Sequence, residues 1–327
     1  MTRIGAIWSV VVLATLLAQA AAAQGVTPKT VNPLTSRAIE APLFNFWGES
    51  QCDGDGNLYF HTGGSGFRSG QIFELARDGS NGRFFQPTGK FADPEVAEFS
   101  NFWVSKDGDV SILAIGGGHN YVIQFDGNGA MKDPLTLQVP EDVTLTDLSM
   151  FDNGFMFVRG HYMHKSAGHR EGQGYGATLT SSGTVAKQLS TIVADVDFND
   201  TKLDEGGVAA ARGNLYLLAP NRISVISPSG ELVRKVAFSK PDRESVATKV
   251  YASGGILVIV LNVLKKSGRD DRISRRYLVL DENTGQATGY YQPPDLGWSD
   301  VCLTPDQEMV FLAAENKKQK LKTARIW

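Results

Sequence analysis

The sequence of 327 residues has only two cysteines, no large excess of either charge, and no long apolar run after its N-terminal segment. The longest later run, GGILVIVLNVL from Gly254, is too short to span a bilayer. Its β-branched and leucine residues are typical of a buried strand. A formal net charge of -3 differs from the strongly basic balance of most dedicated nucleic-acid binders. We therefore expect no nucleic-acid partner and no transmembrane segment in the mature chain.

The N-terminal segment has the three regions of a secretory signal peptide. Arg3 precedes the apolar stretch IGAIWSVVVLATLLAQA, which is followed by the small residues of AAAQG. The pattern predicts a signal peptide over residues 1–23, and an uncleaved membrane anchor is the less favoured alternative. Residues 24–327 contain no Pro/Ser-rich linker, which favours one domain. The mature protein is then exported, either to a periplasm or to the medium.

The stretch CDGDGNLYF at residues 52–60 begins like a calcium loop of the EF-hand type. Such a loop needs glycine at its sixth position and a bidentate carboxylate at its twelfth. Counting from Asp53, these positions hold Leu58 and Gly64, so the calcium interpretation fails. Asp, Asn and Gly before an apolar run also predict a tight turn that enters a strand.

The same turn-and-strand pattern recurs along the chain. Six copies occur, and the first core residues of their strands lie 42 to 60 residues apart, close to the period of propeller blades. These residues are Leu58, Val110, Phe155, Leu215, Leu257 and Met309. A second hairpin follows each of the first five copies, which makes each unit a four-stranded meander.

The sixth unit ends one strand short, whereas TSRAIEAPLF at residues 35–44 is a strand-like segment without a partner. Closing the last blade with this N-terminal strand would leave no exposed sheet edge there. The sequence therefore predicts an all-β fold, a six-bladed β-propeller of four-stranded antiparallel blades. In each blade, strands a to d run from the central channel outward.

The a-b and c-d turns share one face of this propeller, which we call the turn face, and carry many acidic residues. They are Asp53, Asp55, Asp78, Asp107, Asp109, Asp126, Asp152, Asp281, Glu282 and Asp306. Aspartate is favoured in turns because it accepts hydrogen bonds from nearby backbone amides. We therefore expect these residues to stabilise turns.

The opposite face, made by the d-a and b-c connections, is here called the loop face. All five histidines map to it: His61, His119, His161, His164 and His169. So do two basic segments, KKSGRDDRISRR at residues 265–276 and KKQKLK at residues 317–322. The first contributes Lys265, Lys266, Arg275 and Arg276, which could bind an anionic ligand. The alternative is that histidines and cations are solvated loop tips.

Polar residues at the starts of the innermost strands should approach the channel mouth. They are Glu49, Asn101, Asp147, Glu205 and Asp300. Carboxylates around one axis repel unless a cation offsets them, so a divalent metal such as calcium could occupy the channel. Water in a polar channel is the alternative.

The two cysteines fit no metal motif, and an oxidising compartment permits a disulfide between them. Cys52 lies six residues before Leu58, and Cys302 lies seven before Met309. This offset of one residue could turn the two side chains toward each other across the gap between blades 6 and 1. Two separately buried thiols are the alternative.

The first blade, GESQCDGDGNLYFHTGGSGFRSGQIFELARDG, resembles a blade of the NHL and gluconolactonase (regucalcin-like) six-bladed propellers. The resemblance rests on strand spacing and on Gly48-Glu49, and it implies that Glu49 is a metal ligand. The later blade entries differ from the Asn-Gly and Asp-Gly of that group, so Asp147, Glu205 and Asp300 are candidates by position alone.

Two functions remain open at this point. The first is an exported binding or scaffolding protein that engages a small molecule, a glycan or a protein through the loop face. The alternative is a metal-dependent hydrolase of the lactonase type, in which a channel metal would polarise a carbonyl and activate water.

Overall fold

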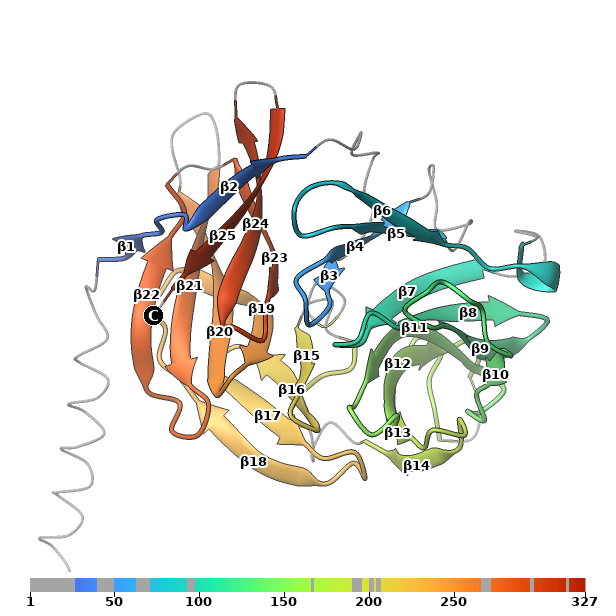
Figure 1. Cartoon of the computed structure of the whole chain (residues 1–327). Helices are drawn as coiled ribbons and strands as arrows, with labels where there is room; N and C mark the ends of the chain where they lie inside the picture. The colour runs from blue at the N-terminus through green and yellow to red at the C-terminus, as the bar shows by residue number, and fades with distance from the viewer. Residues whose placement is uncertain are drawn as a thin grey trace, which may run out of the picture.

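The computed structural model describes residues 27–39, 50–62, 71–92, 98–165, 168–189, 196–199, 203, 207–265, 272–294, 297–315 and 318–326. Six sheets, antiparallel except for one added edge strand, surround a central axis (Figure 1). The predicted six-bladed β-propeller with four-stranded blades is therefore confirmed. The signal peptide predicted over residues 1–23 lies outside the described residues. Within the described part, no helix has the length and apolar character needed to cross a membrane.

The first three blades follow one another along the chain, each from its innermost to its outermost strand. Blade 1 contains β3 (Gln51–Cys52), β4 (Leu58–Thr62), β5 (Gln71–Leu75) and β6 (Asn81–Phe85). A turn of 3₁₀ helix, η1 (Gly89–Ala92), precedes blade 2, which contains β7 (Glu98–Val104), β8 (Val110–Gly116), β9 (His119–Phe125) and β10 (Leu135–Thr136). Blade 3 contains β11 (Val143–Met150), β12 (Met156–Tyr162), β13 (Gly174–Leu179) and β14 (Val185–Gln188).

The last three blades have the same order, with two N-terminal strands added. Blade 4 contains β15 (Val208–Ala211), β16 (Asn214–Ala219), β17 (Arg222–Ile226) and β18 (Leu232–Ala237). Blade 5 contains β19 (Ser245–Ser253), β20 (Ile256–Lys265), β21 (Arg272–Asp281), β22 (Ala287–Gln292) and the added strand β1 (Lys29–Thr30). Blade 6 contains β23 (Trp298–Leu303), β24 (Glu308–Glu315), β25 (Lys318–Arg325) and β2 (Thr35–Ala38).

The N-terminal strand closes the last blade as the sequence predicts. β2 pairs antiparallel with β25, from Thr35 opposite Thr323 to Ala38 opposite Lys320. The structure adds a contact that the sequence does not predict, because β1 pairs parallel with β22 of blade 5. Val31, between these two strands, is buried against the core of blades 5 and 6. The N-terminal segment thus fastens two blades together.

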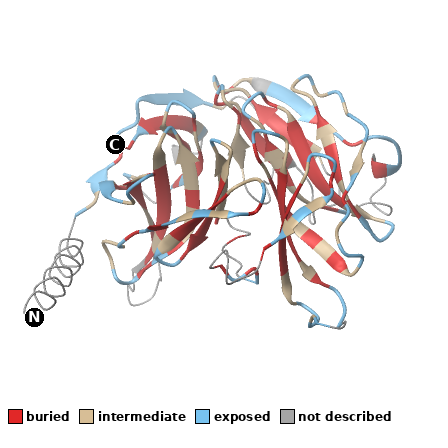
Figure 2. Ribbon diagram, turned by 90° about the horizontal axis from the view of Figure 1, so that it is seen from below, coloured by how far each residue is buried: buried red, intermediate tan, exposed pale blue. Residues whose placement is uncertain are grey.

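Six hydrophobic clusters lie between neighbouring blades and form the core. Side chains of a strand alternate between the two sides of its sheet, so each blade can pack against both neighbours. The cluster between blades 6 and 1, for example, combines Leu58 and Phe60 with Val310 and Leu321. Figure 2 shows the buried residues concentrated in the middle of the blades and the exposed residues at turns and edges. Packing between blades therefore holds the ring together.

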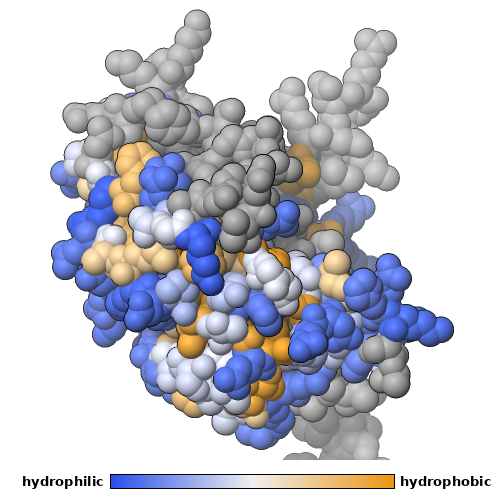
Figure 3. Space-filling model, turned by 90° about the vertical axis from the view of Figure 1, so that its right-hand side faces the viewer, coloured by the Kyte–Doolittle hydropathy of each residue, from blue (hydrophilic) through white to orange (hydrophobic). Residues whose placement is uncertain are grey.

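The outer surface is mainly hydrophilic on the side seen in Figure 3, with small hydrophobic groups between polar side chains. Exposed large apolar residues are scattered over several blades, as with Phe84 on β6, Val233 on β18 and Ile273 on β21. Such scattered residues are usual on soluble domains and need no partner to explain them.

The DGDGN segment is a turn whose side-chain hydrogen bonds converge on Asp53. Its Oδ1 accepts from the backbone amides of Asp55 at 3.0 Å and Asn57 at 2.9 Å. Its Oδ2 accepts from Asn57 Nδ2 at 2.8 Å and from the Tyr59 hydroxyl at 2.9 Å. Burial, together with the neighbouring Asp53 carboxylate, raises the pKa of Tyr59. Aspartates at later turns, such as Asp126 and Asp281, accept backbone amides in the same way.

We expect Asp53→Ala to lower the free energy of unfolding by about 1–3 kcal/mol, because the buried Tyr59 hydroxyl and the donors of Asp55 and Asn57 would lose their acceptor. Urea denaturation of the purified protein measures the change. Asp78→Ala is the matched control, since the exposed Asp78 carboxylate accepts only from Ser80 among the described residues. Equal midpoints for the two variants would contradict this role of Asp53.

Candidate functional site

β-Bulges interrupt the innermost strands of four blades. They occur between Phe99 and Asn101 in β7, Leu145 and Asp147 in β11, Ala247 and Lys249 in β19, and Asp300 and Cys302 in β23. A bulge bends its strand and re-aims nearby side chains, and bulges are common beside functional sites. Each of these four has a polar residue next to it: Asn101, Asp147, Lys249 or Asp300. Local backbone geometry thus gathers polar groups near the axis.

A cavity of about 690 Å³ occupies the centre of the ring. All six innermost strands contribute to its lining, which includes Gln51, Trp103, Ser149, Ala209, Tyr251 and Leu303. It continues to the a-b turns of the turn face, where Gly54, Asp107, Gly154, Arg212, Gly254 and Pro305 line it. The cavity therefore reaches the face opposite to the loop face on which the sequence placed ligand binding.

On one side of the cavity, Asp147 forms a buried polar cluster. Its Oδ1 accepts from Asn101 Nδ2 at 2.9 Å, and its Oδ2 accepts from Arg159 Nε at 2.6 Å and from the Thr146 hydroxyl at 3.2 Å. Asp147 and Arg159 are both buried. The carboxylate charge is thus balanced by the guanidinium, and both carboxylate oxygens accept hydrogen bonds.

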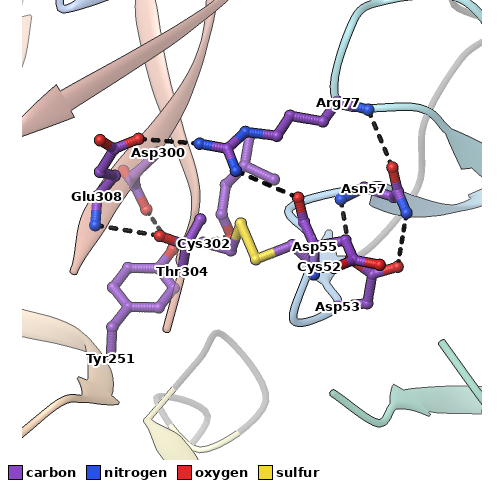
Figure 4. The surroundings of a disulfide bond; sticks show 11 residues. Cys52, Asp53, Asp55, Asn57, Arg77, Tyr251, Asp300, Cys302, Thr304 and Glu308 are labelled. Atoms are coloured by element: carbon purple, nitrogen blue, oxygen red, sulfur yellow. Dashed lines mark hydrogen bonds and ion pairs between the residues drawn. A yellow bond between two sulfur atoms is a disulfide. The ribbon is translucent and has the colours of Figure 1, made fainter. Parts of the chain in front are cut away.

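Asp300 forms a second cluster on the side of blades 5 and 6. Its Oδ2 accepts from the Tyr251 hydroxyl at 2.7 Å, a contact visible in Figure 4. Its Oδ1 accepts from Arg275 Nη1 at 3.2 Å and the Tyr277 hydroxyl at 3.4 Å. Lys249 Nζ lies 3.9 Å from Oδ2. Burial and the Asp300 carboxylate raise the pKa of Tyr277 well above its ordinary value, so this hydroxyl stays protonated and donates.

The predicted metal ligands come together only in part. Asn101 and Asp147 are in contact, Asp300 belongs to a separate cluster, and Glu49 and Glu205 lie outside the described residues. A divalent metal would need carboxylate oxygens that Asp147 and Asp300 already direct toward cations and hydroxyls. Among the described side chains, no group of three His, Cys, Asp or Glu residues could hold a metal ion. The described residues do not fit a metal centre of the lactonase type.

The histidines lie at the loop-face ends of blades 1 to 3, as their mapping predicts. His61 is buried one residue before the end of β4, and burial lowers its pKa. His119 begins β9, and His161 lies near the end of β12. His164 is exposed, and His169 stacks on the Tyr162 ring with the centroids 3.9 Å apart. The described contacts bring no two of these histidines together.

The arginines predicted to bind an anion are engaged with carboxylates of the protein. Arg275 contacts Asp300, and Arg276 contacts Asp242. The Tyr290 hydroxyl accepts from Arg276 at 2.9 Å and donates to Asp242 at 2.5 Å. Burial and that bond to Asp242 raise the pKa of Tyr290 to about 12. Lys265 ends β20, and Lys266 lies outside the described residues.

A disulfide joins Cys52 on β3 to Cys302 on β23, and the two Cα atoms are 6.0 Å apart. It links the innermost strands of blades 1 and 6 beside the cavity, as Figure 4 shows. Arg77 Nη2 bonds Glu308 Oε2 at 3.1 Å across the same seam. The seam at which the chain closes its ring therefore has a covalent bond and an ion pair.

Sequence reasoning did not single out Trp103, Arg159, Lys249 or Tyr251. One signal for Lys249 existed, because it occupies in β19 the place after the bulge that Asn101 and Asp147 occupy in β7 and β11. Aligning the repeats by their innermost strands would have paired ATKVY with LTDLS, which places Lys249 opposite Asp147. The ion pair between Arg159 and Asp147 follows from the pairing of β11 with β12, and no comparable sequence signal predicts it.

No protein-family model matches the sequence, and no curated protein matches it. Solved structures do match the fold. A candidate exported protein from Bacteroides fragilis has a TM-score of 0.57 at 11% identity, over 92% of this chain and 98% of that one. A luciferin-regenerating enzyme has a TM-score of 0.52 at 10% identity, over 90% and 95%. A candidate gluconolactonase has 0.50 at 12% identity, also over 90% and 95%.

The chain thus has the six-bladed propeller fold that gluconolactonase-like proteins share. The resemblance noted in the first blade is confirmed at the level of the fold. Sequence identities of 10 to 12% do not assign the activity, substrate or metal of those proteins to this chain.

Proposed function

We propose that this protein is an exported binding protein that holds a small molecule in the cavity at the centre of the ring. The observation that carries the proposal is the cavity itself, whose volume of about 690 Å³ lies within the usual range of ligand sites. Its lining combines the aromatic side chains of Trp103 and Tyr251 with the polar groups of Gln51, Ser149 and Lys249. Such a combination supplies contact area together with a few orienting hydrogen bonds.

The cavity favours a small molecule over a glycan chain or a protein as the partner. Most of the lining residues belong to innermost strands and their turns, and Trp103 and Tyr251 lie on two of these strands, so a ligand must enter the ring to reach them. A protein surface could reach only the turn-face rim. Ligand binding at the loop face is less favoured than binding in the cavity, because Arg275 and Arg276 already pair with Asp300 and Asp242.

Export to a periplasm or to the medium is part of the proposal. It is supported by the N-terminal sequence pattern and by the Cys52–Cys302 disulfide, since disulfides persist mainly in oxidising compartments. The fold likeness to a candidate exported protein is consistent with it.

A lactonase-type hydrolase is the second candidate function, and it is suggested by the fold likeness to the candidate gluconolactonase. The described carboxylates Asp147 and Asp300 are already balanced by Arg159 and Arg275. We therefore derive no metal-dependent step for this chain.

The test is a thermal-shift panel of sugars, amino acids and organic acids on the purified mature protein. A ligand that binds only the folded state raises the melting temperature by mass action. We expect a stabilising compound to lose at least half of its shift in Trp103→Ala, which removes an aromatic wall of the cavity. A second variant, Ala209→Trp, should reduce the shift by filling the cavity. Phe84→Ala is the control, because it removes an aromatic ring from the outermost strand of blade 1.

Stabilisation that is equal in wild type, Trp103→Ala and Ala209→Trp would place the ligand outside the cavity and overturn the proposal. Loss of the shift in Phe84→Ala alone would do the same. Circular dichroism verifies that each variant keeps its fold, so that a lost shift reports binding.

A further inference from the structure

We propose that Lys249 anchors an anionic group of the cavity ligand, which is then a small amphipathic organic anion such as a carboxylate or sulfonate. The inference rests on the proposed function and names its ligand class. Lys249 extends from β19 into the lining of the cavity, and its side chain is 26% exposed. A lysine ammonium has three hydrogen-bond donors and no acceptor.

The first reason is that Lys249 lacks a hydrogen-bond acceptor among the residues that the structure describes. Its closest carboxylate oxygen, Asp300 Oδ2, is 3.9 Å from Nζ, which is beyond hydrogen-bond distance. That oxygen instead accepts from the Tyr251 hydroxyl at 2.7 Å. The other oxygen of Asp300 accepts from Arg275 and Tyr277. The donors of Lys249 are therefore available to a ligand in the cavity.

The second reason is the balance of charge around the bulges. Asp147 is paired with Arg159, and Asp300 lies beside two cations, Arg275 at 3.2 Å and Lys249 at 3.9 Å, so the Asp300 cluster has one more positive charge than its carboxylate balances. The charges that line the cavity toward the turn face nearly cancel. They are Asp53, Asp107, Asp109 and Asp152 against Lys106, Lys132 and Arg212. These turn-face groups have one negative charge in excess, so the positive excess is confined to the Asp300 cluster, where an anion placed at Lys249 would balance it.

The third reason is that part of the lining is apolar. Trp103 lies on blade 2, Ala209 and Ala211 lie on blade 4, and Leu303 lies on blade 6. The small alanine side chains leave room for the body of a ligand, and the indole ring offers a flat apolar wall. A ligand with one anionic group and an apolar or aromatic body would satisfy both parts of the cavity.

Two fluorescent probes of similar shape and different charge test the inference. Anilinonaphthalene sulfonate carries an anionic group on an aromatic body, and phenylnaphthylamine has a similar body without charge. Both are titrated into wild type, Lys249→Met and Lys249→Arg. We expect Lys249→Met to weaken sulfonate binding by about tenfold or more, as the loss of a charge-assisted hydrogen bond implies. Lys249→Arg should retain most of the affinity, and the affinity for the neutral probe should not change.

The control variant is Lys187→Met, which makes the same charge change on β14, where Lys187 pairs with Glu231 at 2.6 Å. It should alter neither titration. Should Lys249→Met be too unstable to titrate, Lys249→Gln makes the same comparison with a polar, uncharged side chain.

Equal sulfonate affinities of wild type and Lys249→Met would overturn the role of Lys249. Binding of the neutral probe without the sulfonate would also overturn it, while leaving the cavity as a binding site. Probe binding that is insensitive to Trp103→Ala and Ala209→Trp would instead contradict the proposed function, so the two failures are distinguishable.

Discussion

Replacing both Cys52 and Cys302 with alanine should lower the free energy of unfolding by up to about 5 kcal/mol. The disulfide closes a loop of 250 residues. In the chain-entropy model, a cross-link of that span removes a large part of the freedom of the unfolded chain. The bond also joins β3, which has only two residues, to the neighbouring blade. Urea denaturation of the oxidised wild type and the double variant measures the difference.

The control for this experiment is wild-type protein treated with a reductant, which should unfold near the midpoint of the double variant. The Arg77–Glu308 ion pair crosses the same seam but is partly exposed, and Glu308→Gln should cost less than about 1 kcal/mol. Two titratable thiols per chain in denatured, unreduced exported protein would refute the bond. So would equal stability of oxidised wild type and double variant.

Removing the Asp147 carboxylate should also have a large effect, with a loss of about 3–5 kcal/mol for Asp147→Leu. The change removes the Asp147 carboxylate, 2.6 Å from Nε of the buried Arg159 guanidinium. Breaking one half of a buried ion pair is costly because the remaining charge is poorly solvated. The double variant Asp147→Leu with Arg159→Met should recover part of the loss, since it removes both charges together. Urea denaturation of both proteins measures the recovery.

A solvent-exposed ion pair supplies the control for Asp147. Lys132 Nζ lies 3.5 Å from Asp109 Oδ2, and both side chains are nearly half exposed. Because Asp109 Oδ1 also accepts the Gly127 amide at 2.8 Å, Asp109→Leu should lower the free energy of unfolding by about 1–2 kcal/mol, still less than Asp147→Leu. If Asp147→Leu cost no more than Asp109→Leu, or if the double variant were less stable than the single one, the buried pair would not have the role assigned to it.

The fold could be predicted because its signals are local. Turn residues such as those of DGDGN are selected by backbone geometry within a few positions, and their recurrence gave the number of blades. The missing last strand pointed to closure by β2. The parallel pairing of β1 could not be found in this way, because a strand of two residues, Lys29 and Thr30, has no periodic pattern. Its position depends on the outermost strand of another blade.

The site was predicted only in part because it depends on register. Asn101 and Asp147 were correctly placed near the channel, yet their hydrogen bond follows from two bulges, each of which shifts a strand by one residue. The partners that neutralise the carboxylates, Arg159 and Arg275, come from the second and third strands of their blades. A charge on a neighbouring strand is not visible in a linear pattern. The sequence suggested a metal beside Asp147 and Asp300, and the structure places guanidinium groups next to these two carboxylates, while Glu49 and Glu205 lie outside the described residues.

The most direct measurement of the central claim is a crystal structure of the protein with anilinonaphthalene sulfonate bound. We expect electron density for the probe inside the ring, with its sulfonate within hydrogen-bond distance of Lys249 Nζ and its rings against Trp103. Density confined to the loop face or the outer blade edges, with the central cavity filled only by water, would contradict the account.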